Sequence, residues 1–112
     1  MKLITAIVRP ERLSDIRSGL EEFGVQGLTV SQASGYGRQK GHKQVYRGAS
    51  YTEDLVQKLR LEILASEVDA PRILEVLLDK ASTGNPGDGK IWVTAADQVL
   101  RVSDRAEGEA AL

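Results

Sequence analysis

Several residue types that particular functions require are absent or rare in this sequence. It contains no cysteine, which excludes a disulfide framework, a cysteine-based zinc site and a thiol nucleophile. The apolar opening stretch, residues 3–8, is interrupted by Arg9 and Pro10, so it is too short for the apolar core of a signal peptide or for a membrane span. A formal net charge of -1 provides no excess of positive charge to attract a polyanion. We therefore expect a cytoplasmic protein that does not bind nucleic acid.

The remaining composition is that of an ordinary globular chain. Of the 112 residues, 41% are hydrophobic and 28% are charged, which is typical of a folded domain. The length predicts a single domain over residues 1–112. Such a domain is large enough for a core but small enough that a partner subunit would help to cover it.

Hydrophobic periodicity predicts five strands and two helices. The strands are expected over residues 2–8, 27–34, 58–64 and 90–94, with a short final strand over residues 98–102. The first helix should begin at Pro10 and end at Gly24, and its apolar stripe consists of Leu13, Ile16, Leu20 and Phe23. The second should be capped by Asp69, with Pro71 in its first turn and an apolar stripe of Ile73, Leu74, Leu77 and Leu78.

This order of elements predicts an α+β fold. It is a ferredoxin-like βαββαβ sandwich with a short extra C-terminal strand and a long loop between strands 2 and 3, and both helices cover one sheet face. The other face should carry polar side chains, namely Thr29, Ser31, Lys58, Arg60 and Glu62. That face is either simply solvated, or it is an oligomer interface or ligand wall.

A glycine-rich loop over residues 82–90 contains the spacing G-x-x-x-x-G-K from Gly84 to Lys90. It is not a P-loop, because Ile91 stands where Ser or Thr should hold Mg²⁺ and because a helix precedes the loop while a strand follows it. Its glycine N–H groups and Lys90 suit an anion. A plain turn between helix and strand explains the same residues equally well.

The long segment over residues 36–57 is polar and interrupted by glycines, and loops of this length inside compact domains are usually functional or disordered. Up to Tyr51 it carries no acidic residue but four basic ones, Arg38, Lys40, Lys43 and Arg47. It is a solvated insertion, a functional loop or a basic arm for nucleic acid. His42 has no partner at metal-ligand spacing, so we interpret it as a solvated residue. Tyr46 and Tyr51 suit either partner contacts or modification.

Three stretches resemble motifs of the PII nitrogen-regulatory signal proteins: GYGRQKGH at residues 35–42, YRGASY at 46–51 and TGNPGDGKIWV at 83–93. The resemblance covers essentially the whole chain. It implies a homotrimer that binds ATP or ADP in clefts between subunits, and that binds 2-oxoglutarate when ATP and Mg²⁺ are present. It also implies that the long loop, called the T-loop and spanning about residues 37–55, docks onto ammonium transporters and nitrogen-metabolism enzymes. The protein would then be recruited reversibly to the membrane through a transporter.

The resemblance also implies roles for individual residues. Thr29, Glu62 and Leu64 match the adenine pocket, while Gly35, Gly37 and Arg38 match the base of the T-loop where it meets the phosphates. The rest of the phosphate side matches Gly87, Asp88, Gly89, Lys90 and Arg101. Gln39 matches the Mg²⁺ ligand, and Gln39 with Lys58 matches the 2-oxoglutarate site. Tyr51 matches the tyrosine that a nucleotidylyltransferase modifies by uridylylation or adenylylation.

The sequence departs from the family pattern at several positions. Ser103 stands where the family often has a second arginine, although Arg105 is close enough to replace it. Asn85 and Pro86 replace a basic and apolar pair, which stiffens the loop, and Ser50 stands where glutamate or alanine is common beside the modified tyrosine. Residues 102–112 should form a polar C-terminal loop. Two alternatives rank behind a non-enzymatic regulator: a nucleotide-hydrolysing enzyme using Asp88, and a basic-loop nucleic-acid-binding module.

Overall fold

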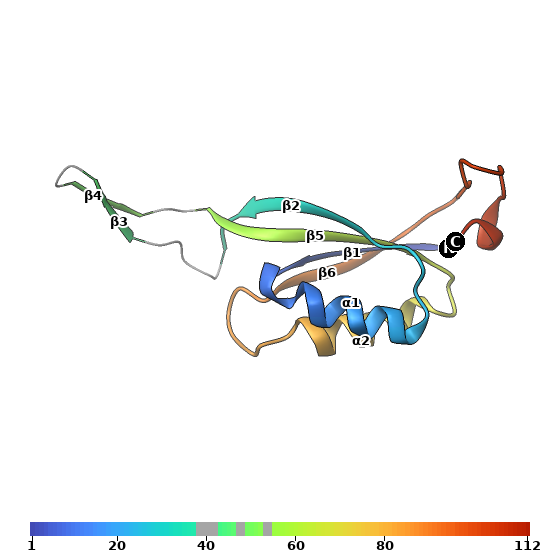
Figure 1. The fold of residues 1–112 in the computed structure, drawn as a ribbon, viewed down its shortest axis with the longest axis horizontal. Helices are drawn as coiled ribbons and strands as arrows, with labels where there is room; N and C mark the ends of the chain where they lie inside the picture. The colour runs from blue at the N-terminus through green and yellow to red at the C-terminus, as the bar shows by residue number, and fades with distance from the viewer. Residues whose placement is uncertain (38–42, 47–48, 53–54) are drawn as a thin grey trace.

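The computed structural model describes residues 1–37, 43–46, 49–52 and 55–112. Its main sheet is four-stranded and antiparallel, in the order β2-β5-β1-β6. The strands are β1 (Lys2–Val8), β2 (Thr29–Gly35), β5 (Val56–Ala65) and β6 (Gly89–Ala95). The helices α1 (Leu13–Phe23) and α2 (Ala70–Ala81) cover one face of this sheet (Figure 1). The predicted α+β ferredoxin-like sandwich is confirmed.

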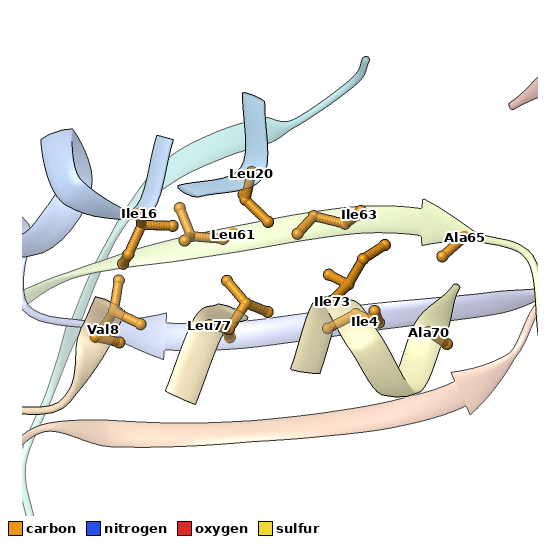
Figure 2. Packing of buried hydrophobic residues seen from close by; sticks show 12 residues of the cluster. Ile4, Val8, Ile16, Leu20, Leu61, Ile63, Ala65, Ala70, Ile73 and Leu77 are labelled. Atoms are coloured by element: carbon orange, nitrogen blue, oxygen red, sulfur yellow. The ribbon is translucent and has the colours of Figure 1, made fainter. Parts of the chain in front are cut away.

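The core lies between the helices and one face of the two central strands. Alternate residues of β1 and β5 point toward the helices, and the antiparallel register pairs Ile4 with Ile63 and Ala6 with Leu61. These side chains pack against the apolar stripes of both helices (Figure 2). The largest fully buried apolar side chains are those of Ile4, Val8, Ile16, Leu20, Leu61, Ile63 and Leu77. Burial of their apolar surface is the main stabilising contribution to the fold.

The helix ends follow the sequence signals with one difference. Pro10 opens the short 3-10 turn η1 (Pro10–Arg12) that leads into α1, and Gly24 ends α1 in the left-handed conformation with φ 105°. Asp69 occupies the N-cap position of α2 but makes no capping bond with its side chain. Instead, the Ser66 hydroxyl accepts a hydrogen bond from the Asp69 N–H at 3.1 Å. The N-cap position was therefore predicted correctly, but the Asp69 side chain does not cap the helix.

Two further segments differ from the sequence-based expectation. The segment between β2 and β5 contains a second sheet, in which β3 (Lys43–Tyr46) pairs with β4 (Ala49–Thr52), and this hairpin extends beyond the main sheet (Figure 1). Its β-branched and aromatic residues favour strands. The short strand predicted over residues 98–102 does not form. Leu100 makes only an isolated bridge to Glu107, because the chain turns back within residues 101–106 and offers no partner strand.

The sheet face opposite the helices carries the predicted polar residues and also apolar ones. The Arg60 Nε lies 3.5 Å from a Glu62 carboxylate oxygen, and the Arg60 guanidinium lies 6.0 Å from the centre of the Trp92 ring. Trp92 is 41% exposed and Leu64 is 45% exposed.

Within the part of the chain that the structure describes, no helix has the length and apolar composition to cross a bilayer.

Candidate functional site

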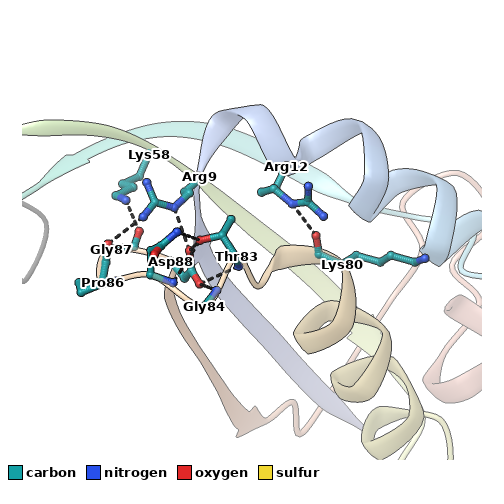
Figure 3. Close-up of polar contacts among 10 residues, drawn as sticks. Arg9, Arg12, Lys58, Lys80, Thr83, Gly84, Pro86, Gly87 and Asp88 are labelled. Atoms are coloured by element: carbon teal, nitrogen blue, oxygen red, sulfur yellow. Dashed lines mark hydrogen bonds and ion pairs between the residues drawn. The ribbon is translucent and has the colours of Figure 1, made fainter.

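The glycine-rich loop, residues 82–90, joins α2 to β6 and is organised around the carboxylate of Asp88. This carboxylate accepts hydrogen bonds from the Thr83 N–H at 2.8 Å, the Thr83 hydroxyl at 2.5 Å and the Gly84 N–H at 2.9 Å (Figure 3). An aspartate that accepts from nearby backbone N–H groups stabilises a turn. Asp88 therefore closes the loop on itself, and its oxygens are already occupied.

Two cationic side chains attach this loop to the sheet. Arg9, directly after β1, donates from Nε to Asp88 at 2.9 Å and from Nη2 to the Pro86 carbonyl at 2.8 Å. Lys58, on β5, donates to the Gly87 carbonyl. Figure 3 shows both side chains reaching the same loop from different strands. The loop is thus held by strands that are distant from it in sequence.

The charges in this region shift two pKa values. Hydrogen bonds from Thr83, followed by the one from Arg9, hold the pKa of Asp88 well below its ordinary value. Burial, followed by repulsion from Arg9, lowers the pKa of Lys58. Asp88 is therefore ionised at neutral pH, and it is surrounded by Arg9 and Lys58. With Lys90 at the start of β6, the end of the sheet where these residues meet carries an excess of positive charge that suits an anionic ligand.

Gly89 is required by the packing of the loop against β1. Its φ is 104°, and a Cβ atom built there would lie 1.7 Å from the Ile7 carbonyl oxygen. Any L side chain at this position would both strain the backbone and collide with a strand. Gly87, with φ 96°, also has a left-handed conformation. The loop therefore approaches the sheet more closely than a loop of ordinary residues could.

A cavity of about 350 Å³ lies beside the loop. It brings together predicted site residues from three separate parts of the sequence. They are Gly35 at the end of β2 and Gly37 just after it, Lys58 on β5, and Gly87, Gly89 and Lys90 of the loop and β6. Tyr36 and Trp92 also line it. Arg38 and Gln39, which were predicted to act at the same place, lie outside the described residues.

A second cavity, of about 880 Å³, brings together the predicted adenine-pocket residues Thr29, Glu62 and Leu64. Phe23, Leu28 and the C-terminal Leu112 add apolar surface to it, and Arg72 adds a positive charge. Lys58 and Leu64 are six residues apart on the same strand, which corresponds to roughly 20 Å. Within one chain, the two groups of predicted nucleotide-binding residues therefore lie at opposite ends of the sheet.

Arg101 belongs to the C-terminal segment, residues 96–112. This segment starts beside the N-terminus, because the Ala96 N–H donates to the Met1 carbonyl at 3.0 Å. Figure 1 shows it at the end of the sheet far from the glycine-rich loop. Arg101 donates to the Asp104 carboxylate at 2.9 Å and to the Ala110 carbonyl at 2.6 Å. Ser103 lies in the turn between Arg101 and Asp104, and Arg105 follows with φ 60°.

The modification and metal predictions are only partly covered by the structure. Tyr51 lies on β4, where it pairs with Gln44 of β3. Among the described residues, no group of three or more His, Asp or Glu side chains is arranged to hold a metal ion. The predicted Mg²⁺ ligand Gln39 lies outside the residues described, and so does His42. These predictions stay predictions.

Sequence reasoning missed Arg9 and Thr83 as members of the loop's network. In the sequence Arg9 is visible only as the residue that ends the apolar opening stretch, and its loop partner Asp88 is 79 residues away. The signal that could have identified it is a charged residue at the end of a buried strand, where it needs a partner. Thr83 had a local signal, since Thr and Asp residues flanking a glycine-rich turn commonly bond its backbone.

Comparisons with known proteins agree with this architecture. A family model for nitrogen regulatory protein P-II matches residues 1–106. The nitrogen regulatory protein P-II of Rhizobium meliloti (strain 1021) is 42% identical over 102 residues, which cover 91% of this chain and 91% of that protein. Nitrogen regulatory protein GlnK of Escherichia coli (strain K12) is 39% identical over 112 residues, which cover 100% of both chains. On these grounds the chain belongs to the P-II family of nitrogen regulatory proteins.

Proposed function

We propose that this protein is a homotrimer that binds ATP or ADP in clefts between its subunits and uses them to set its regulatory state. Proteins of the P-II family are regulatory signal proteins rather than enzymes, and membership supports a role in nitrogen signal transduction. The proposal adds the ligands and the assembly to that role.

The observation that carries the proposal is the separation of two half-sites. Gly87, Lys90 and Lys58 line a cavity at one end of the sheet, and Thr29, Glu62 and Leu64 line a cavity at the other end. One nucleotide contacts both sets only when a second copy of the chain places its far end beside the first. A closed ring of such head-to-tail contacts repeats the same site at each interface. The exposed Trp92 and Leu64 on the open sheet face give this assembly apolar surface to bury.

The chemistry of the two half-sites fits a nucleotide. The glycine-rich loop supplies backbone N–H groups, and Lys58 and Lys90 supply positive charge, which together suit a polyphosphate. The other cavity combines apolar surface from Leu64 and Phe23 with polar groups on Thr29 and Glu62, which suits a flat heterocyclic base. Arg101 lies at this second end and would add a cation from the neighbouring subunit.

We further propose that 2-oxoglutarate binds when ATP and Mg²⁺ are present. The Lys58 ammonium would pair with a carboxylate of 2-oxoglutarate, and the amide oxygen of Gln39 would be a ligand to the metal. Bound Mg²⁺ would neutralise phosphate charge and orient the two anionic ligands. Lys58 donates to the Gly87 carbonyl in this structure, so 2-oxoglutarate would either replace that acceptor or bind another of the three Lys58 N–H groups.

The hairpin β3–β4 is the part of the chain that we propose contacts regulated proteins. It lies beside the phosphate end and extends beyond the main sheet (Figure 1). Docking there onto an ammonium transporter or a nitrogen-metabolism enzyme would connect ligand binding to regulation, with a cytoplasmic protein recruited reversibly to the membrane. Tyr51 on β4 is the proposed acceptor for a nucleotidylyltransferase.

No specific observation favours the two alternatives. A nucleotide-hydrolysing enzyme needs a general base, but the Asp88 carboxylate already accepts hydrogen bonds from Thr83, Gly84 and Arg9, and its pKa is lowered. Such a carboxylate is too weak a base to activate water near neutral pH. A nucleic-acid-binding module is opposed by the net charge of -1.

Calorimetric titration with ATP, ADP and 2-oxoglutarate tests the proposal. We expect wild-type protein to bind ATP and ADP, and to bind 2-oxoglutarate only with ATP and Mg²⁺. Lys58→Ala should weaken 2-oxoglutarate binding by more than it weakens ATP binding, because its ammonium pairs with a carboxylate. Lys90→Ala should weaken nucleotide binding itself.

Lys80→Ala is a matched control, since Lys80 is a partly exposed lysine on α2, near Asp79, and lines neither cavity. It should leave all three affinities unchanged. Sedimentation of the same samples should give a trimer. A monomer at micromolar concentration, or 2-oxoglutarate binding that is equal with ADP or with no nucleotide, would contradict the shared-cleft proposal.

A further inference from the structure

We infer that Arg9 is a positioning residue for the nucleotide phosphates: it holds the glycine-rich loop in the place from which Gly87 and Lys90 line the proposed phosphate cavity. The inference rests on the proposed nucleotide binding and goes beyond it, because it assigns a role to a side chain that does not line either cavity.

The Arg9 guanidinium contacts the loop at two points. Its Nε donates to the Asp88 carboxylate at 2.9 Å, and its Nη2 donates to the Pro86 carbonyl at 2.8 Å. A guanidinium is planar and rigid, so two bonds from different nitrogens fix the direction of the loop as well as its distance. A lysine ammonium has its three donors on one freely rotating nitrogen, so it fixes the direction of the loop less firmly.

The base of the Arg9 side chain is itself held firmly. Arg9 follows Val8, which is 1% exposed and belongs to the buried end of the central strand β1. The Arg9 side chain is only 14% exposed, so it is shielded from the competition of water. On the loop side, Asp88 transmits the constraint to the Thr83 and Gly84 N–H groups. The position of the loop is therefore fixed relative to the buried end of β1.

The planarity of the peptide bond turns this contact into an orientation of donors. Among the residues that the structure describes, every peptide bond of the glycine-rich loop is trans, so the C=O and N–H groups of each peptide unit there point in opposite directions. Arg9 binds the Pro86 carbonyl, which directs the Gly87 N–H away from Arg9. Lys58 binds the Gly87 carbonyl, which directs the Asp88 N–H away from Lys58.

Two successive N–H groups are thus oriented by cations that hold the carbonyls. Within the described residues, neither N–H donates a hydrogen bond to another group. Backbone N–H groups without a partner in the protein suit an anion, and Gly87 lines the proposed phosphate cavity. Arg9 binds the Pro86 carbonyl directly. It also binds Asp88, the residue that follows Gly87, whose carbonyl is bound by Lys58. Arg9 therefore constrains both of these peptide units.

The test compares affinities for ATP, ADP and AMP, measured with Mg²⁺, in wild-type protein and in Arg9→Met. We expect roughly tenfold weaker ATP binding, which corresponds to the loss of one charge-assisted hydrogen bond. The loss should be smaller for ADP and smallest for AMP, because these nucleotides have fewer phosphates to contact the loop. A purely structural role would weaken all three nucleotides equally. Equal losses, or no loss, would overturn the inference.

Arg12→Met is the matched control. Arg12 is also partly buried and also donates to a backbone carbonyl, that of Lys80 at 2.8 Å, but it does not contact the glycine-rich loop. It should leave the three affinities unchanged. Arg9→Lys keeps the charge and should restore only part of the ATP affinity, because it lacks the two separate, rigidly spaced nitrogens with which Arg9 bonds Asp88 and Pro86. Full recovery with lysine would mean that charge alone acts, and would overturn the inference.

Amide hydrogen exchange in the protein without nucleotide separates this inference from the proposed function. The Thr83 and Gly84 N–H groups should exchange faster in Arg9→Met than in wild type, because Asp88 loses its anchor. Unchanged exchange would show that Arg9 does not hold the loop. Wild-type protein that binds none of the three nucleotides would instead overturn the proposed function, and the inference with it.

Discussion

The glycine-rich loop and the C-terminal segment are both irregular, and each is organised around one arginine and one aspartate, but the two pairs differ in sequence separation. Arg9 and Asp88 are 79 residues apart, and a strand end is thereby joined to a loop. Arg101 and Asp104 are three residues apart and close a single turn. Figure 1 shows the two segments at opposite ends of the sheet.

This difference determines what each segment depends on. The glycine-rich loop takes its conformation from β1 and β5 through Arg9 and Lys58, and Arg9 is only 14% exposed. The C-terminal segment takes its conformation mainly from itself, and Arg101 is 43% exposed, so water and salt weaken its ion pair. Changes in the loop should therefore reach the sheet, whereas changes around Arg101 should stay local.

The largest expected effect is that of Gly89→Ala. The new Cβ would collide with the Ile7 carbonyl and would also force alanine into a φ of 104°, so the loop must move away from β1. We expect a loss of about 3 kcal/mol or more in the free energy of unfolding, measured by urea denaturation. Gly84→Ala is the matched control.

Gly84 has a φ of 82° but open space around it, so its alanine variant carries only the backbone strain of about 1 kcal/mol. A wide gap between the two variants would support a loop that is fixed against the sheet. If Gly89→Ala and Gly84→Ala lose the same stability, the loop is free to move and the comparison between the two segments fails.

The sequence was sufficient for the elements whose signal is periodic. Both helices and all four strands of the main sheet were expected from their apolar spacing, because Ile4, Ile63 and Leu77 belong to patterns that repeat within one element. The sheet register also follows, since a shift by one residue would expose the whole buried face. The convergence of Lys58 and Lys90 on one cavity followed from the family motifs rather than from periodicity.

The contacts that depend on tertiary structure were not predictable in this way. The bond between Arg9 and Asp88 joins residues 79 positions apart and belongs to no repeating pattern. The strand expected over residues 98–102 failed for a related reason, since a strand requires a neighbour and the chain returns as a tight turn, with the Arg101 N–H bonded to the Ala106 carbonyl. The glycine at position 89 was assigned to phosphate binding, but its tight contact with Ile7 was not anticipated.

The next effect is a dependence of stability on pH. The folded protein lowers the pKa of Asp88 from an ordinary value of 3.8, so its ionised form is stabilised by folding. This contribution is complete above the ordinary pKa and is lost as the pH falls below it. We expect Asp88→Asn to be less stable than wild type at neutral pH, and this difference should shrink below about pH 4. Thermal unfolding at a series of pH values measures it.

Asp104→Asn provides the comparison at the other end of the molecule. The pKa of Asp104 is also lowered, first by the Ala106 N–H and also by Arg101, so the sign of the effect is the same. Its side chain is 52% exposed, however, and the loss should be smaller and more sensitive to salt. Equal losses for the two variants at high salt would contradict the view that only the loop is anchored to the sheet.

The smallest expected effect is that of Arg101→Gln on the stability of the isolated protein. Its bonds to Asp104 and to the Ala110 carbonyl lie within the same segment, and partly exposed ion pairs contribute little to stability. We expect a change of less than about 0.5 kcal/mol in the free energy of unfolding, with unchanged amide exchange in β1 and β5. The exchange of the Ala106 N–H, which donates to Asp104, should by contrast become faster, because its acceptor loses the guanidinium that holds it. A loss above about 1 kcal/mol, or faster exchange in the sheet, would show that the C-terminal segment is anchored to the body as the glycine-rich loop is. In that case Arg101 and Arg9 would act alike, and sequence separation would not distinguish the two ends.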